Sequence, residues 1–264
     1  MINTLVKPAI SAFIRKALAA LTMMAMVSAF AGQEPLPPPP TAWSAPVNDN
    51  AMTGSVLFDR LERTWGNNGE DTLTWDAKAW YGGDYNRLWL KTEGENGIGA
   101  AGGEMEAELL YGRLVMPFWE FQAGLGYERL YGPGPDHDRV SAVIGFQGLA
   151  PYWFEIDTSL RASEDGDISA VLEAEYEVLL TQRLILQPRF ETALAAQEVK
   201  QFGVGQGFNF VQLGLRLRYE IRREIAPYIG VSWMRKLGDT ADLARDEGED
   251  TSNVSLVAGV RFWF

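Results

Sequence analysis

The chain has 264 residues, no cysteine, 27 glycines, 12% aromatic residues and a formal net charge of −12. The lack of cysteine excludes a disulfide-stabilised scaffold and any Cys-ligated zinc or iron–sulfur site. The acidic balance argues against nucleic acid as a partner, because binding to phosphates depends on basic side chains. At this length we expect one main domain, since an all-β barrel can use such a chain as a single unit.

Residues 1–31 have the pattern of a cleaved secretory signal peptide. A positively charged start is followed by the uncharged apolar run 17–30 and by a small-x-small cleavage site that ends at Ala31. The basic residues are Lys7, Arg15 and Lys16. A membrane-anchor helix is the alternative, but the apolar run is short for a bilayer span. We expect a mature chain that starts at Gly32, and loss of the three basic residues changes the net charge from −12 to about −15.

Residues 32–50 contain Pro35 and the run Pro37–Pro40, which predicts an extended, largely disordered leader. Residues 51–264 then alternate between polar and apolar side chains with a period of two, and turn signals interrupt this pattern. We predict about twelve strands of roughly ten residues, the length that a tilted strand needs to cross a bilayer. The predicted strands are 53–65, 71–81, 87–95, 104–117, 118–129, 138–148, 151–162, 167–179, 182–195, 208–222, 226–236 and 253–264.

Two architectures fit alternating strands, and the connections favour one of them. A soluble sandwich turns its apolar faces inward, whereas a membrane barrel turns them toward lipid and its polar faces toward the lumen. The predicted connections alternate between short and long, as in up-and-down barrels with short periplasmic turns and longer outside loops. We therefore predict an all-β, transmembrane, antiparallel up-and-down β-barrel in the outer membrane, monomeric and in contact with lipid. Slips of the alternation at 57–61 and 111–113 indicate possible β-bulges.

The last predicted strand supports the membrane interpretation. Its outward face is apolar, and the chain stops on a phenylalanine, which resembles the signal that the assembly machinery of outer-membrane barrels recognises. The alternative is an ordinary apolar edge strand. The residues of this face are Leu256, Ala258, Val260, Phe262 and Phe264. With an even number of strands, both termini should lie in the periplasm.

The predicted lumen collects acidic and basic side chains, which allow two interpretations. They could form a polar path in which acids attract cations, or they could fill a narrow barrel with salt bridges. We favour salt bridges, because the acidic and basic sets come from adjacent strands. The predicted inward groups include Asp157, Glu173, Glu175, Glu177, Arg161, Arg189, Glu191, Arg216 and Arg218.

Other candidate residues are sparse. His137, the single histidine, lies in a predicted outside loop between Asp136 and Asp138, where a general base or a metal ligand is conceivable but a solvated side chain is the simpler interpretation. The thioethers of Met105 and Met234 suit Cu(I) but more often serve as packing. No nucleophile elbow, phosphate loop or clustered metal-ligand spacing occurs, so we do not expect an enzyme.

Several segments are similar to the copper resistance protein B family of outer-membrane proteins. They sample the barrel from its second strand to its last: 76–94 (DAKAWYGGDYNRLWLKTEG), 145–156 (GFQGLAPYWFEI), 172–190 (LEAEYEVLLTQRLILQPRF), 213–240 (LGLRLRYEIRREIAPYIGVSWMRKLGDT) and 257–264 (VAGVRFWF). The resemblance implies that the chain binds copper or passes it across the outer membrane, beside a periplasmic multicopper oxidase. Copper would be a transported or transiently bound ion.

One departure from the family limits this inference. Members commonly carry a Met/His-rich segment before the barrel, and residues 32–50 contain neither residue. Copper contacts would therefore come from the barrel or its loops, and our candidates are Met234, Met105, His137, Glu173, Glu175 and Asp157. The competing functions are a narrow general channel for small polar solutes and an outer-membrane enzyme, either an omptin-like protease or a phospholipase.

Overall fold

A computed structural model describes residues 51–67, 71–99, 102–132 and 135–264. The predicted signal peptide (1–31) and Pro-rich leader (32–50) lie outside these residues and stay predictions. Within the described residues, no helix is long and apolar enough to span a membrane.

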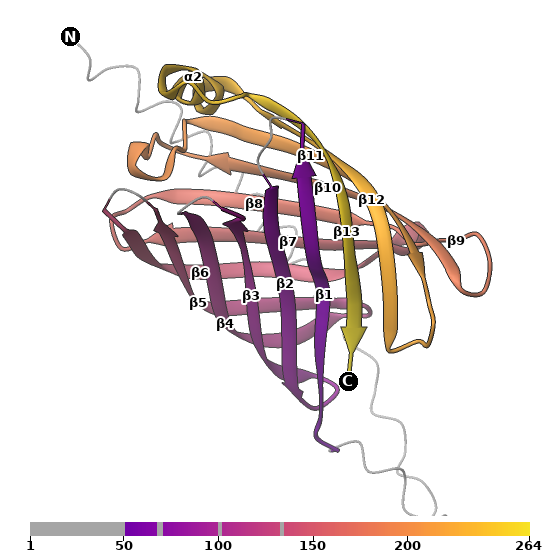
Figure 1. Ribbon diagram of the computed structural model, residues 1–264. Coiled ribbons are helices and arrows are strands. Elements are labelled where there is room, and N and C mark those ends of the chain that lie inside the picture. Colours follow the sequence, from indigo (N-terminus) through magenta and orange to yellow (C-terminus); the bar gives the residue numbers. More distant parts are fainter. Residues whose placement is uncertain (1–50, 68–70, 100–101, 133–134) are drawn as a thin grey trace, which may run out of the picture. The chain divides into compact units, whose positions relative to one another are not determined.

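The described part of the chain forms one antiparallel sheet that closes on itself (Figure 1). Each strand pairs with the next along the chain, except that β8 and β9 both pair with β10, and the last strand pairs with the first, so the described sheet has no open edge. The strands are β1 (Thr53–Gly66), β2 (Asp71–Gly82), β3 (Asn86–Gly97), β4 (Gly103–Met116), β5 (Trp119–Tyr131), β6 (His137–Ala150), β7 (Phe154–Ser163), β8 (Ile168–Glu175), β9 (Val178–Leu179), β10 (Leu184–Ala195), β11 (Gly207–Tyr219), β12 (Ile225–Lys236) and β13 (Ser252–Trp263).

These strands occupy twelve positions around the barrel, as the sequence predicts. The short strand β9 continues the line of β8, because both pair with β10: Glu175 lies opposite Arg189, and Leu179 lies opposite Ile185. The predicted strand 167–179 is therefore interrupted once, between Glu175 and Val178. Counted over the described residues, the barrel has twelve strand positions, and β1 begins on the same side of it where β13 ends.

The faces of the strands are inverted relative to a soluble protein. In β11, Leu213 and Leu215 are exposed while Arg216 and Arg218 are buried, and in β2, Leu73 is exposed while Asp76 is buried. Because successive side chains point to opposite sides of a sheet, this alternation places the apolar set outside and the charged set inside. A closed barrel with an apolar outer surface and a polar interior is the architecture of bacterial outer-membrane proteins.

The sequence also predicts where the alternation slips, with mixed success. The pairing of β1 shifts between Phe58 and Arg60 against β2, and between Phe58 and Glu62 against β13, which confirms a bulge within 57–61. In β4 the shift lies between Leu114 and Met116, so the prediction for 111–113 is wrong by a few residues.

Two local predictions need correction. The predicted strand 151–162 begins at Phe154, because Pro151–Trp153 forms a 3-10 turn in which Tyr152 and Trp153 have positive φ angles. The predicted loop 237–252 contains the helix α2 (Gly238–Glu247), so the chain is not purely β. The polar composition of this segment predicts a loop, because the helix buries only Thr240, Ala241 and Ala244 and so lacks a clear apolar face.

The two ends of the barrel differ as predicted. The turns on the side where β1 begins and β13 ends are short, such as the one between β4 and β5 at Pro117–Phe118. The connections on the opposite side are longer, and they include α2 and the short 3-10 helix η3 (Lys200–Phe202) between β10 and β11. We call these the turn end and the loop end of the barrel.

Candidate functional site

The interior of the barrel holds most of the charged groups that the structure buries. Alternation within each strand brings them there, and several of the ion pairs that result join strands that are not neighbours in the sheet. The lumen is therefore crossed from wall to wall by side chains. Five clusters and one apolar patch make up much of its contents.

Arg189 of β10 is the centre of the first cluster. Its guanidinium lies 2.7 Å from Glu173, 3.1 Å from Glu175 and 3.3 Å from Glu191, on β8 and on β10 itself. It also lies 3.8 Å from Asp76 of β2, on the other side of the lumen. Only 4% of the Arg189 side chain is exposed. An arginine fits this position because its planar group offers five donors to several carboxylates at once.

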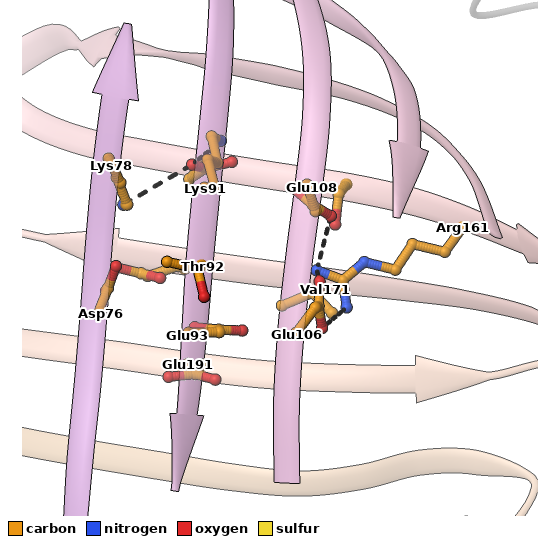
Figure 2. Close-up of a pocket in the computed structure, with 13 residues that line it drawn as sticks. Asp76, Lys78, Lys91, Thr92, Glu93, Glu106, Glu108, Arg161, Val171 and Glu191 are labelled. Atoms are coloured by element: carbon orange, nitrogen blue, oxygen red, sulfur yellow. Dashed lines mark hydrogen bonds and ion pairs between the residues drawn. The ribbon is translucent and has the colours of Figure 1, made fainter. Parts of the chain in front are cut away.

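The second cluster joins β2 and β3 to β7. The Lys91 ammonium lies 2.7 Å from a carboxylate oxygen of Asp157, and the Lys78 ammonium lies 4.0 Å from the same oxygen. Both lysines come from one wall and the aspartate from the other. Figure 2 shows Lys78 and Lys91 on adjacent strands, with Asp76 and Glu93 beside them.

The third cluster joins β4 to β7 through Arg161. Its guanidinium forms an ion pair with Glu106 and lies 3.1 Å from Glu108 (Figure 2). The fourth cluster is centred on Arg60 of β1, which lies 3.2 Å from Asp76 and 3.7 Å from Glu93. Since Asp76 also contacts Arg189, the first and fourth clusters are connected through one carboxylate.

The fifth cluster is the most enclosed. Arg216 of β11 donates two hydrogen bonds to the carboxylate of Glu62 in β1, with lengths of 2.8 and 3.0 Å. The hydroxyl of Tyr228 donates a third hydrogen bond to Glu62 at 3.0 Å. All three side chains are buried. Three donors to one carboxylate satisfy it well, as burial of a charge requires.

An apolar patch interrupts the polar lumen. Trp89, Leu110 and Val143 are buried on the inner faces of β3, β4 and β6, and Trp80 packs against them. The Arg87 guanidinium lies 4.4 Å from the centre of the Trp80 ring, a cation–π contact. The expectation that inward faces are polar therefore does not hold for this patch.

Space remains between these clusters. One cavity of about 60 Å³ is lined by acids and bases of the first four clusters, and a cavity of about 230 Å³ lies against the turn between β6 and β7. Lys78, Asp157 and Glu173 line both cavities and so lie between them. On this scale one water needs roughly 10–15 Å³, so the smaller cavity holds a few waters.

The structure brings some of the predicted copper contacts together and separates others. Asp157, Glu173 and Glu175 all line the larger cavity, and Glu173 lies opposite Asp157 in the pairing of β7 with β8. Each of the three carboxylates contacts an arginine or a lysine. Among the described residues, no three histidine or acidic side chains converge as metal ligands would.

The other three candidates lie elsewhere. Met234 follows buried Ser232 on the inner face of β12, near the loop end, opposite Gln212 and Asn253. Met105 alternates with the inward-facing Glu106 and Glu108, so it shares the outer face with exposed Leu109. The parity of β4 therefore turns the Met105 side chain away from the lumen, and its role as a copper contact near the outside rim stays a prediction.

His137 is the first residue of β6, opposite Leu130 of β5 at the loop end, and not part of a loop as the sequence predicts. Its ring centre is 6.2 Å from that of Phe202 in η3, and the Arg139 guanidinium lies 4.2 Å from the same Phe202 ring. The connection between β10 and β11 thus reaches the wall formed by β6. The hydroxyl of Thr240 in α2 accepts hydrogen bonds from the Gly205 amide and the Asn209 side chain, both 2.9 Å long, which fastens α2 to this connection.

Sequence reasoning missed several luminal groups. Arg60 and Glu62 follow the bulge of β1. The register shift there breaks the period of two, so alternation no longer identifies the inward face. The predicted inward set omits Glu106 and Glu108, because the alternation slips at 111–113 of the same predicted strand, although acids at 104, 106 and 108 keep a clear period of two. That period was the available signal for an inward acidic row.

Comparison with known proteins gives consistent matches. The model of a family described as Copper resistance protein B precursor matches residues 52–264. Copper resistance protein B of Escherichia coli is 44% identical over 218 residues, which are 83% of this chain and 72% of the relative. A Copper resistance protein B homolog of Pseudomonas syringae pv. tomato is 39% identical over 218 residues, with the same coverage. Among solved structures, the NanC porin covers 80% of this chain and 99% of its own, with 13% identity and a TM-score of 0.49.

Proposed function

The chain belongs to the copper resistance protein B family, and from this premise we propose that its lumen passes copper ions across the outer membrane, holding them transiently. A role in copper resistance follows from the family. The observation that supports passage is the acidic content of the two luminal cavities, where Asp157, Glu173 and Glu175 provide oxygen ligands in an enclosed space.

Transient contact fits these residues better than storage. Carboxylates bind copper more weakly than imidazoles or thiolates do, and here each acid is already paired with a basic group. An entering cation must compete with that partner, so its residence at any one carboxylate is short. His137 and Met234 are the softer ligands near the loop end, and we propose them as first contacts on that side.

The orientation and partners complete the proposal. We propose that residues 1–31 are removed on export, that residues 32–50 form a periplasmic leader, and that both termini face the periplasm. The short connections of the turn end would then meet a periplasmic partner, for which a multicopper oxidase is our candidate. We further propose a monomeric, non-catalytic barrel.

The test is copper entry into liposomes that contain the full-length mature chain and an enclosed copper-sensitive dye. We expect Cu(II) to enter faster than Mg²⁺, and the Glu173→Gln variant to slow copper entry, because Arg189 would then lose a neutralising partner and repel cations. Glu249→Gln, in an exposed loop pair with Lys236, is the matched control and should leave entry unchanged.

A narrow general channel is the competing function. It would pass Mg²⁺ and a small neutral sugar as readily as copper, with no dependence on Glu173. That outcome would contradict the copper proposal while leaving the barrel as a pore.

A further inference from the structure

We propose that Lys78 and Lys91 act as tethered cations that close an acidic constriction between the two luminal cavities, and that a permeating cation must displace them from Asp157. This deepens the proposed function, because it identifies the residues that control passage. It does not require the cation to be copper, so it can be tested separately.

The position of these residues is the first support. Lys78, Asp157 and Glu173 are shared by both cavities, and Lys91 lines the smaller one. An ion that moves from one cavity to the other must pass between them. The contact of Lys91 with Asp157 spans the lumen from β3 to β7, so it closes the space between opposite walls.

The number of contacts distinguishes the lysines from the arginines around them. Arg189 contacts four carboxylates and Arg161 contacts two. By contrast, Lys91 and Lys78 each lie within ion-pair distance of one carboxylate among the described residues. That carboxylate is Asp157 in both cases, at 2.7 Å from Lys91 and 4.0 Å from Lys78. The arginines therefore hold the wall in place, whereas each lysine is held by one aspartate.

The chemistry of the lysine side chain supports movement. Its ammonium is a compact charge on a flexible four-carbon stem, whereas a guanidinium is a rigid fork that matches several carboxylates. A cation that arrives near Asp157 can replace the ammonium without rearranging the backbone. The lysine can then turn toward Asp76, Glu93 or Glu191, which line the same cavity.

The partial exposure of the contact supports replacement of the lysine by another cation. The side chains of Lys91, Lys78 and Asp157 are 13%, 21% and 23% exposed, so solvent reaches them within the lumen. Attraction between partly hydrated charges is weaker than in a dry interior. Exchange of one cation for another therefore has a modest free-energy cost.

The proposal predicts opposite effects for the two sides of the contact. Lys91→Gln together with Lys78→Gln removes the tethered cations and leaves Asp157 as an unneutralised acid, while Glu173 keeps its pair with Arg189. Asp157→Asn instead removes the acid and leaves two positive charges. The first change should favour cation passage and the second should oppose it, whereas a merely structural ion pair would respond alike to loss of either partner.

The experiment measures single-channel conductance and reversal potential of the full-length mature chain in a KCl gradient. The Lys78/Lys91 double variant should raise conductance roughly twofold or more and shift the reversal potential toward that of K⁺, because acids without partners concentrate cations locally. Asp157→Asn should shift the reversal potential toward that of Cl⁻. Lys236→Gln is the matched control, since Lys236 forms a similar 2.6 Å pair with Glu249 at the loop end.

Folding of each variant is verified by the gel shift that folded barrels show on heating. If the double variant does not fold, Lys91→Arg provides the test, because a bidentate guanidinium should hold Asp157 more firmly and lower the conductance. Unchanged conductance and selectivity in folded variants would overturn the proposal that the lysines control passage. Reversal-potential shifts of the same sign in the lysine double variant and in Asp157→Asn would overturn it as well. If the variants show the expected shifts in KCl but copper neither enters nor blocks the channel, the copper proposal fails. The proposed displacement of the lysines from Asp157 is then still supported.

Discussion

At the scale of single residues, the exposure of an ion pair determines how much the loss of one partner destabilises the barrel. Arg216 and Glu62 have side chains that are 5% and 4% exposed, whereas those of Arg63 and Asp71 are 48% and 31% exposed. Both pairs have a shortest distance of 2.8 Å, so distance alone does not distinguish them. The difference lies in how much water would solvate the charge that remains if its partner were removed.

We predict that Arg216→Met lowers the free energy of unfolding by about 3–5 kcal/mol, since it leaves the Glu62 charge buried without its main partner. Arg63→Met should change it by less than about 1 kcal/mol, because water can replace the lost partner. Urea unfolding of the lipid-reconstituted barrel, followed by tryptophan fluorescence, measures both. Equal effects would show that Glu62 is better solvated than its burial indicates.

At the scale of elements, each strand has a lipid face and a luminal face, and depth along the strand matters as well. Leu90 lies near the middle of β3 and is 52% exposed, between Ala79 of β2 and Leu109 of β4. Val254, the third residue of β13, is similarly exposed at 50% but lies toward the loop end. The two positions share a face and differ in depth.

Leu90→Arg should therefore destabilise the barrel by about 2–4 kcal/mol, as a charge at the bilayer midplane does, whereas Val254→Arg should cost about 0–1 kcal/mol near the interface. Reversible unfolding in liposomes tests the difference. A small cost at both positions would argue that the outer face of β3 is covered by protein or water rather than lipid.

At the scale of the whole molecule, the barrel depends on one seam between the first and last strands. The Val56 amide donates to the Phe264 carbonyl at 2.9 Å, and the Phe264 amide donates to the Val56 carbonyl at 3.0 Å. Beside them, the rings of Phe58 and Phe262 stack with centres 4.6 Å apart. The bulge of β1 begins just after Phe58, so these contacts hold the seam where its regular ladder ends.

Deletion of Phe264 should lower the unfolding free energy by about 1–3 kcal/mol, because two backbone groups lose their partners at the seam. Phe264→Ala keeps both backbone hydrogen bonds and should have the smaller effect. The temperature at which the heat-modifiable gel band converts to the unfolded form measures both variants. If the alanine variant were equally destabilised, the aromatic side chain rather than the backbone would stabilise the seam.

Local pattern was sufficient for the outline of the barrel. Alternation in segments such as 211–222 specifies which side chains face outward, since the period of a strand is a property of the backbone. Short and long connections followed from turn residues and polar runs in the same way. The pattern failed at the register shift of β4, at the 3-10 turn Pro151–Trp153, and in α2, which buries a small set of residues.

The sequence by itself determined the class of fold, the strand positions and the inward placement of charge, because all of these depend on neighbours along the chain. Only the tertiary structure decided which charges meet. Lys91 and Asp157 are separated by 66 residues, and Arg216 and Glu62 by 154. Whether such side chains touch depends on barrel closure and on the registers of all the strands between them, which set their height across the lumen. For that reason the candidate acids could be named from the sequence, but the contacts that could control passage between them could not.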